Sequence, residues 1–361
     1  MDKLFYPAKK HFSLNTWDYL SDKNKIRRFK TDLLQIGKFI NTNDFLFMYM
    51  SDVLFIPAFI DFMLRSGMKC KILLNLFHTG RFFSDLTFHT NRVRRIINST
   101  RNIREKLGIY IMVDTEQLQS ELFLLAGEKF PILPMFHSMY IDNSNSIKNR
   151  KRKQISYLSA AKIKGLQQFV DLITYIKTND PQLFNEVNFY VRLLAHSDEN
   201  QKIVHCIHDK VKVEYGQVSD SDYKDLLIKT DIMLLPYLRR YFYARTSGVF
   251  NDSLMNKIPV VVTRDTWMGN HAERLGIGEV FDENVPEQFY NAIKKVLKNY
   301  TSYTQNRVAA IDEWRNYHSV NNFYEMINKI KEEKKSKLNF RSRLRFKLVK
   351  MKIEKELNNF Y

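Results

Sequence analysis

The hydrophobic positions in the second half of the chain form short apolar runs, separated by longer segments with helical periodicity. Apolar runs of strand length, bounded by polar or turn residues, are typical of strands buried on both faces of a parallel sheet. The strands are predicted at residues 155–158, 187–194, 211–215, 231–236 and 260–263, with helices at 166–177, 200–209, 219–229 and 249–256. This alternation predicts a doubly wound α/β domain.

The first half of the chain shows the same alternation with fewer elements. Apolar-rich elements at residues 45–50, 53–65, 71–76 and 109–113 follow one another as the parts of βαβ units do. Residues 1–43 show no opening strand, and 23–39 has the pattern of a helix. The sequence therefore predicts a second Rossmann-like domain that is shortened at its start.

A polar and basic stretch separates the two halves. DNSNS at 142–146 is followed by KNRKRK at 148–153, a composition typical of an exposed linker. After the second half, the helical segment 303–330 is apolar on one side. The predicted organisation is a first domain at 1–145, a linker at 146–154, a second domain at 155–302, a helix at 303–330 and a basic tail at 331–361.

Positive charge concentrates in that tail, which holds 11 Lys and Arg against 4 Glu in a chain of net charge +18. Phe340, Leu344, Leu348 and Met351 recur at helical spacing among the basic residues, which predicts a basic amphipathic helix. Each basic residue near an anionic leaflet contributes about 1 kcal/mol of binding. A solvated tail is the alternative, and nucleic acid is disfavoured because few aromatic residues lie among the basic ones. An anionic membrane surface is the predicted partner.

Cysteine usage and the lack of long apolar runs indicate the compartment. Cys70 and Cys206 are the two cysteines, and their spacing fits neither a disulfide framework nor a zinc site. No apolar run approaches the roughly 20 residues of a membrane span, and the N-terminal sequence lacks the apolar core of a signal peptide. The predicted location is the cytoplasm, peripheral on the inner face of the cytoplasmic membrane.

The segment 230–263 has the pattern of a strand, a glycine-bearing loop, a helix and a second strand. Pro236 closes the first strand, Ser247-Gly248 opens the helix, and Pro259 precedes the second strand. A glycine at the helix start lets a ligand approach the backbone, and the first N–H groups of a helix attract an anion. The segment therefore predicts a phosphate-binding site.

This segment also resembles the nucleotide-sugar signature of the GT-B glycosyltransferases, especially the retaining family four. The matching residues are Asp231, Pro236, Ser247-Gly248, Asp252, Pro259 and residues 260–263. The family carries a pair of glutamates, and the chain has Ala244 and Asp252 at those positions. The resemblance implies the GT-B fold, with two Rossmann-like doubly wound domains that face a cleft and a C-terminal helix that crosses back to the first domain. It also implies a nucleotide-diphosphate sugar donor and retention of anomeric configuration.

Cleavage of such a donor requires positive groups beside the diphosphate, because negative charge develops there as the glycosidic bond breaks. YLSAAKIKG at 157–165 resembles the family motif that ends in Lys-Gly, with Ser159 where the family has an arginine. The residues predicted to bind the diphosphate are Lys162, Lys164, Arg245, Ser247 and Gly248, with Asp252 at the ribose and Trp267 and Gly269 at the sugar or the cleft. A plain surface lysine and interdomain packing of Trp267 are the alternatives.

Two further candidates follow predicted strands of the first domain. His78 follows the strand 71–76 and Asp114 follows the strand 109–113, at the edge where open α/β sheets bind ligands. A histidine there orients an acceptor hydroxyl or takes its proton, and His78 resembles the family's acceptor-side histidine. Asp114 is a candidate general base, with helix capping as the alternative. No DxD motif lies between apolar strands, so metal-independent transfer without a cofactor is predicted.

These observations predict a glycosyltransferase that moves a sugar from a nucleotide-diphosphate sugar to a lipid-linked or surface-polysaccharide acceptor at the cytoplasmic membrane face. Two alternatives stay open. One is another GT-B enzyme, such as a nucleotide-sugar epimerase or an inverting transferase. The other is a non-catalytic module that binds a nucleotide sugar or anionic lipid. Donor-dependent turnover distinguishes the last of these from the enzymes.

Overall fold

The chain is divided into two compact units. Unit 1 comprises Met1–Leu133 and Glu325–Tyr361, and unit 2 comprises Pro134–Tyr324. The computed structural model describes residues 22–41, 44–51, 53, 55–77, 86–135, 152–193, 210–305 and 308–332. The predicted helix at 200–209, the candidate His78 and residues 333–361 of the basic tail lie outside the described residues.

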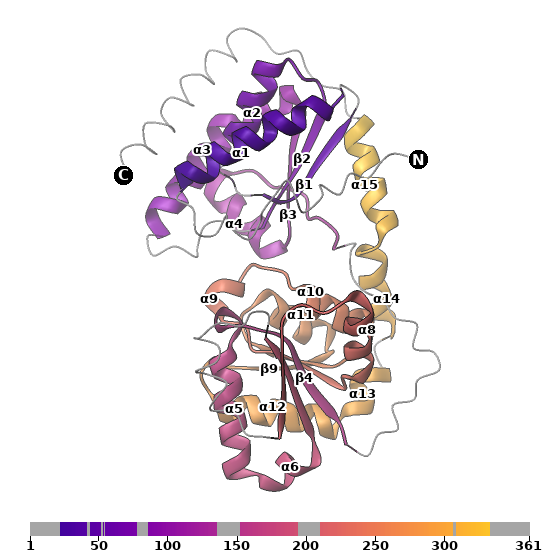
Figure 1. Ribbon diagram of the computed structural model, residues 1–361. Coiled ribbons are helices and arrows are strands. Elements are labelled where there is room, and N and C mark those ends of the chain that lie inside the picture. The colour runs from indigo at the N-terminus through magenta and orange to yellow at the C-terminus, as the bar shows by residue number, and fades with distance from the viewer. Residues whose placement is uncertain are drawn as a thin grey trace. The chain divides into compact units, whose positions relative to one another are not determined.

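Unit 2 is built on a six-stranded parallel sheet with the order β6-β5-β4-β7-β8-β9 (Figure 1). Its strands are β4 (Gln154–Ala160), β5 (Asn188–Leu193), β6 (Val211–Tyr215), β7 (Ile232–Leu235), β8 (Val260–Thr263) and β9 (Gly278–Phe281). The five predicted strands are confirmed. The order reverses between β4 and β7, which makes this pair the topological switch point of the sheet.

Helices link and cover these strands. They are α5 (Leu166–Asn179), α6 (Pro181–Glu186), α8 (Asp220–Lys229), α9 (Arg239–Phe242), α10 (Gly248–Met255), α11 (Trp267–Leu275), α12 (Pro286–Lys298), α13 (Tyr300–Gln305) and α14 (Val308–Tyr317), with a 3-10 turn η3 (Lys162–Lys164). α5 packs against α12 (Figure 1). All four residues of β7 and of β8 are buried, as expected for central strands covered on both faces.

The predicted helical segment 303–330 is not one continuous helix. It is divided among α13, α14 and α15 (Val320–Glu332). The break before α15 has a local cause, because the Ser319 hydroxyl accepts a hydrogen bond from the backbone N–H of Asn322 at 3.1 Å and so caps a new helix. The boundary between unit 2 and unit 1 falls inside α15, after Tyr324.

Unit 1 contains a three-stranded parallel sheet in the order β1-β2-β3. Its elements are α1 (Asp22–Ile36), the 3-10 turn η2 (Gly37–Phe39), β1 (Phe45–Ser51), α2 (Phe55–Ser66), β2 (Lys71–Leu76), α3 (Leu86–Leu107), β3 (Ile109–Val113) and α4 (Glu116–Ala126). β2 lies in the middle of this sheet, and its last five residues are buried. The βαβ alternation predicted for the first half is confirmed, and α1 confirms the predicted opening helix.

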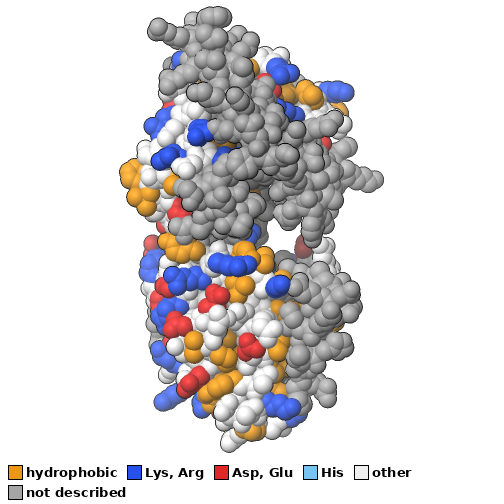
Figure 2. Space-filling model, turned by 90° about the vertical axis from the view of Figure 1, so that its left-hand side faces the viewer, with side chains coloured by type: hydrophobic (Ala, Val, Ile, Leu, Met, Phe, Trp, Pro, Cys, Tyr) orange, Lys and Arg blue, Asp and Glu red, His pale blue; other side chains and the backbone are white. Residues whose placement is uncertain are grey.

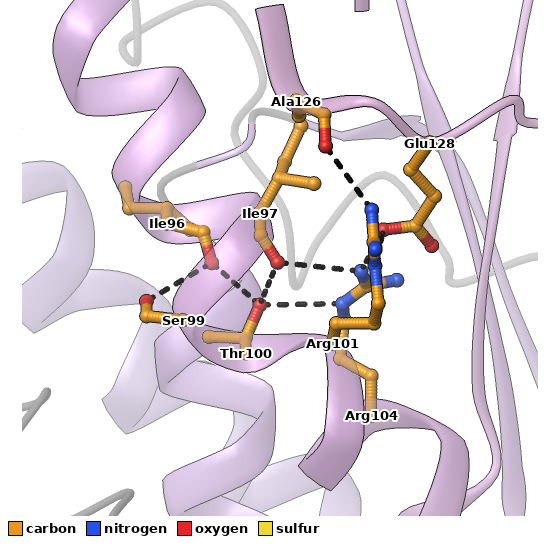
Figure 3. Close-up of polar contacts among 8 residues, drawn as sticks. All are labelled: Ile96, Ile97, Ser99, Thr100, Arg101, Arg104, Ala126 and Glu128. Atoms are coloured by element: carbon orange, nitrogen blue, oxygen red, sulfur yellow. Dashed lines mark hydrogen bonds and ion pairs between the residues drawn. The ribbon is translucent and has the colours of Figure 1, made fainter. Parts of the chain in front are cut away.

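An ion-pair cluster around the buried Arg104 joins α3 to the segment after α4 (Figure 3). Arg104 Nη2 lies 2.8 Å from Glu128 Oε2, and Arg101 Nε lies 2.9 Å from the same oxygen. The Arg104 side chain is 3% exposed, and Thr100 Oγ1 accepts a further hydrogen bond from its Nε. Burial lowers the pKa of Arg104, and the nearby Glu128 carboxylate opposes that shift. These arginines of α3 therefore stabilise the fold of unit 1.

The charge on unit 2 is of mixed sign over the face shown in Figure 2. On the lower part of that view, Lys and Arg side chains lie among Asp, Glu and hydrophobic side chains. Ion pairs also join opposite charges in unit 2, for example Arg264 with Asp282 and Lys295 with Glu279. The positive charge of the described residues therefore does not form one continuous patch on this face. No helix in the described part of the chain is long and apolar enough to cross a membrane.

Candidate functional site

The loops that follow β4 and β7 are locked together at the switch point. Gly165 has φ +83°, and a Cβ built on it would lie 1.7 Å from the carbonyl oxygen of Pro236. The backbone N–H of Leu238 donates to the carbonyl of Ile163 at 3.3 Å. Only glycine permits this conformation and this approach. The Lys-Gly pair found in the sequence therefore fixes one loop of the switch point against the other.

Lys164 has contacts at its backbone carbonyl and at its side-chain ammonium. The Tyr157 hydroxyl donates to the carbonyl oxygen of Lys164, which anchors the backbone. The ammonium lies 5.1 Å from the centre of the Tyr237 ring, and Tyr237 is fully buried. Lys162 lies on η3 and is exposed. Both predicted lysines are therefore at the carboxyl edge of β4, beside the switch point.

The predicted anion site at the start of α10 has the geometry of a helix N-terminus. Ser247 Oγ accepts a hydrogen bond from the N–H of Phe250 at 3.3 Å and caps the helix. Gly248 is exposed, and no atom of the described residues lies within 4 Å of the place where a Cβ would stand. Arg245 is partly buried with its guanidinium 5.2 Å from the Phe242 ring. An anion can approach the first N–H groups of α10 closely.

Asp252 lies on α10 with 8% of its surface exposed. The Tyr223 hydroxyl on α8 donates to Asp252 Oδ2 at 2.9 Å. Burial raises the pKa of Tyr223, and the Asp252 carboxylate raises it further, so the hydroxyl stays protonated and remains a donor. The Arg192 guanidinium lies 5.8 Å from the Tyr223 ring. No sequence pattern marks Tyr223 or Arg192, because both reach this place from other elements.

The remaining donor-side candidates lie in the interior of unit 2. Trp267 is 2% exposed, and its rings pack 5.5 Å from Phe250 and 5.8 Å from Trp314. A Cβ on Gly269 would lie 2.7 Å from the carbonyl oxygen of Thr263, so this glycine permits close packing of α11. The contacts seen for these two residues are packing contacts. Their contact with a sugar stays a prediction.

In unit 1, Asp114 follows β3 and belongs to a polar cluster. The Asn75 amide on β2 donates to Asp114 Oδ1 and, at 2.8 Å, to the carbonyl oxygen of Tyr49 on β1. Asn75 is fully buried, and its Oδ1 has no hydrogen-bond partner among the described residues. Thr115 caps α4 through the N–H of Leu118 at 3.0 Å. Thr115, and not Asp114, is therefore the residue that caps α4, and Asp114 stays a candidate for the acceptor side.

Comparison with solved structures identifies the class of fold. No protein-family model and no curated protein sequence matches the chain. A UDP-forming trehalose-phosphate synthase from Burkholderia xenovorans matches with a TM-score of 0.62 and 11% identity, covering 86% of this chain and 79% of that one. WaaG, a glycosyltransferase involved in lipopolysaccharide biosynthesis, matches with a TM-score of 0.53 and 14% identity over 78% of this chain and 81% of that one.

A third match is an E. coli trehalose-6-phosphate protein bound with UDP-2-fluoro glucose. Its TM-score is 0.63 with 12% identity, and the match covers 87% of this chain and 79% of that one. These identities are low, so the matches define architecture. The chain has the α/β GT-B fold, and the fold class predicted from the sequence is confirmed.

Proposed function

We propose that the chain is a glycosyltransferase whose unit 2 binds a nucleotide-diphosphate sugar. The observation that carries this proposal is the placement of Lys164 and the α10 N-terminus, which follow β4 and β7, the two strands of the switch point. Ligands of open α/β sheets bind outside the carboxyl ends of the strands at this point. The solved relatives of this fold support the proposal, since one of them holds UDP-2-fluoro glucose.

Different residues bind the diphosphate and the ribose of the donor. Negative charge develops on the diphosphate as the glycosidic bond breaks, and preorganised cations and N–H groups stabilise it. Lys164 supplies an ammonium, with Lys162 and Arg245 as further cations, and Ser247-Gly248 supplies backbone N–H groups. Asp252 accepts hydrogen bonds from the ribose hydroxyls. Because these groups supply the positive charge, we propose transfer without a metal or another cofactor. The resemblance to the retaining family four supports retention of anomeric configuration.

The acceptor is a glycan or a lipid-linked glycan, bound by unit 1. Asp114 lies at the carboxyl edge of that sheet, where a carboxylate accepts a hydrogen bond from an acceptor hydroxyl, and His78 is a second candidate for that role. The basic tail 331–361 would hold the enzyme on an anionic membrane surface at the cytoplasmic face. The match to WaaG, which acts in lipopolysaccharide biosynthesis, supports a surface polysaccharide as the product.

A second candidate function is a GT-B module that binds the donor without turnover. The observation that favours it is Ala244, which lies in the loop before α10 where the resembled family carries a glutamate. An alanine contributes no carboxylate to the sugar. An inverting transferase or a nucleotide-sugar epimerase is a further alternative for the same fold.

The test is release of nucleoside diphosphate from a panel of nucleotide sugars, with and without a lipid-extract acceptor. Wild type is compared with Lys164→Ala, and Lys177→Ala is the matched control because Lys177 is an exposed lysine at the far end of α5. We expect acceptor-stimulated release that is lost only in Lys164→Ala. Thermal protection by a donor without release would support the binding module, and neither release nor protection would contradict both functions.

A further inference from the structure

Tyr237, which follows Pro236 at the end of β7, joins three elements of the switch point. Its side chain is fully buried, and its hydroxyl shares a hydrogen bond with Ser159 Oγ on β4. Its ring packs 4.5 Å from the Phe242 ring on α9. The face of the same ring lies 5.1 Å from the Lys164 ammonium. The ring is therefore fixed from two sides and presents its face to one cation.

This arrangement holds a positive charge without neutralising it. A carboxylate partner would bind the ammonium strongly and compete with a phosphate for it, whereas an aromatic face attracts the ammonium through its quadrupole and leaves the net charge intact. Among the described residues, Lys164 makes no ion pair with an Asp or Glu. A lysine side chain also loses considerable rotamer freedom when it is immobilised, and a prior restraint lowers that cost at the moment of binding.

The backbone of Lys164 is restrained as well. The Tyr157 hydroxyl donates to its carbonyl oxygen, and the next residue, Gly165, lies tightly against the Pro236 carbonyl. The position of the ammonium relative to the backbone is then set by the side-chain torsions, and the Tyr237 ring is the aromatic face over which the ammonium lies. Ser159 adds one hydrogen bond to the Tyr237 hydroxyl, while the packing of the ring against Phe242 does not depend on that hydroxyl.

We propose that Tyr237 is a positioning residue that holds the Lys164 ammonium ready for the diphosphate of the donor. This inference rests on the proposed function, since it assumes that Lys164 binds the diphosphate. It adds that the strength of diphosphate binding depends on the aromatic face of Tyr237. The hydroxyl group is secondary, so a phenylalanine retains most of the effect.

The test is isothermal titration of UDP, GDP, ADP, CDP and dTDP into the full chain, followed by variants with the nucleotide that binds best. We expect Tyr237→Leu to weaken binding roughly tenfold, from the strength of a desolvated cation–π contact. Tyr237→Phe should stay within about twofold of wild type because the ring remains. In a Lys164→Ala background, Tyr237→Leu should cause no further loss, since the cation that it positions is absent.

A core variant controls for general destabilisation of unit 2. Phe289 is buried on α12 and stacks on the Phe281 ring of β9, away from Lys164, and Phe289→Leu should lower the melting temperature without changing the nucleotide affinity. If Tyr237→Leu weakens binding equally with and without Lys164, the residue is merely structural and the inference is wrong while the proposed function stands. No loss in Tyr237→Leu would also overturn the inference. If wild type binds none of the five nucleotides, both the inference and the proposed function fail.

Discussion

The two sheets of this protein are built from the same βαβ parts and differ in strand order. In unit 2 the order β6-β5-β4-β7-β8-β9 reverses between β4 and β7, whereas the described strands of unit 1 follow the chain as β1-β2-β3. A reversal leaves two loops diverging from neighbouring strands, and ligands bind between them. Strand order, more than composition, therefore favours unit 2 as the unit that binds the proposed nucleotide.

The two units also use their cations differently. In unit 1, Arg101 and Arg104 converge on Glu128, so their charge stabilises the protein itself. At the switch point of unit 2, the ammonium of Lys164 lies over the aromatic ring of Tyr237. An aromatic partner leaves the net charge in place for a ligand. Substitutions in each unit can therefore separate a stabilising charge from a ligand-binding one.

The largest expected effect is on the ion pair between the buried Arg104 and Glu128 in unit 1. Glu128→Ala leaves the Arg104 charge buried without its partner, which costs about 3–5 kcal/mol of unfolding free energy. Arg101 is 38% exposed in its side chain, so Arg101→Ala is the matched control and should cost less than about 1 kcal/mol. Urea unfolding of both variants measures this. Equal losses in the two variants would contradict the structural role given to Arg104.

The second effect concerns the lock at the switch point. Gly165→Ala adds both a strained left-handed φ and a clash with the Pro236 carbonyl, and we expect a loss of about 2–5 kcal/mol. Gly216 also has positive φ, +91°, but no atom of the described residues lies within 4 Å of the place where its Cβ would stand, so Gly216→Ala should lose only about 1–2 kcal/mol. Thermal unfolding with and without nucleoside diphosphate measures both. A smaller loss for Gly165→Ala than for Gly216→Ala would refute the locked loops.

A third prediction tests whether unit 1 serves the acceptor alone. Asp114→Asn removes the carboxylate charge that is proposed to accept a hydrogen bond from the acceptor hydroxyl. The kcat/KM for the acceptor should fall roughly 10- to 100-fold, as expected for a lost hydrogen bond to a charged group. Release of nucleoside diphosphate without acceptor should not change. Glu116→Gln changes charge equally at the exposed start of α4 and is the control. A parallel fall in acceptor-free release would show that Asp114 acts on the donor.

The smallest effect concerns a surface network of unit 2. The N–H of Leu183 and the Tyr290 hydroxyl lower the pKa of Asp180, so this carboxylate stabilises the fold above its unfolded pKa and loses that contribution as pH falls through the folded pKa. Tyr290→Phe should cost less than about 1 kcal/mol at neutral pH. The difference from wild type should shrink only below the ordinary pKa of an aspartate, about 3.9, because the folded pKa of Asp180 is lowered. Melting temperatures from pH 7 to about pH 2 measure it, with Tyr175→Phe as the control, and a constant difference would contradict the assignment.

Much of unit 2 could be predicted from the sequence because its central strands β7 and β8 are buried on both faces and therefore consist of continuous apolar runs. β9 was missed because it is short and only half buried, with Glu279 in the middle. In unit 1, the long helix α3 was missed for a different reason. Arg92 and Arg104 lie on its buried side, which interrupts the apolar stripe that marks an amphipathic helix.

The candidate site divides in the same way. Ser247-Gly248 and Lys164-Gly165 could be found because local chemistry, a helix cap and a left-handed glycine, requires those residues next to one another. Tyr237, Tyr223 and Asn75 could not be found, because each acts on a residue that is distant in the sequence. A pattern read along the chain contains no information on which strand lies beside which until the strand order is known.

Donor binding at the switch point is tested most sharply by comparing how the protein binds a nucleoside diphosphate and the parent nucleoside. The two ligands share base and ribose, so their difference in affinity measures what the diphosphate contributes in unit 2. We predict that wild type and Lys177→Ala prefer the diphosphate strongly and that Lys164→Ala loses most of this preference. Equal affinities for the two ligands in wild type, or an unchanged preference in Lys164→Ala, would contradict a diphosphate site at Lys164.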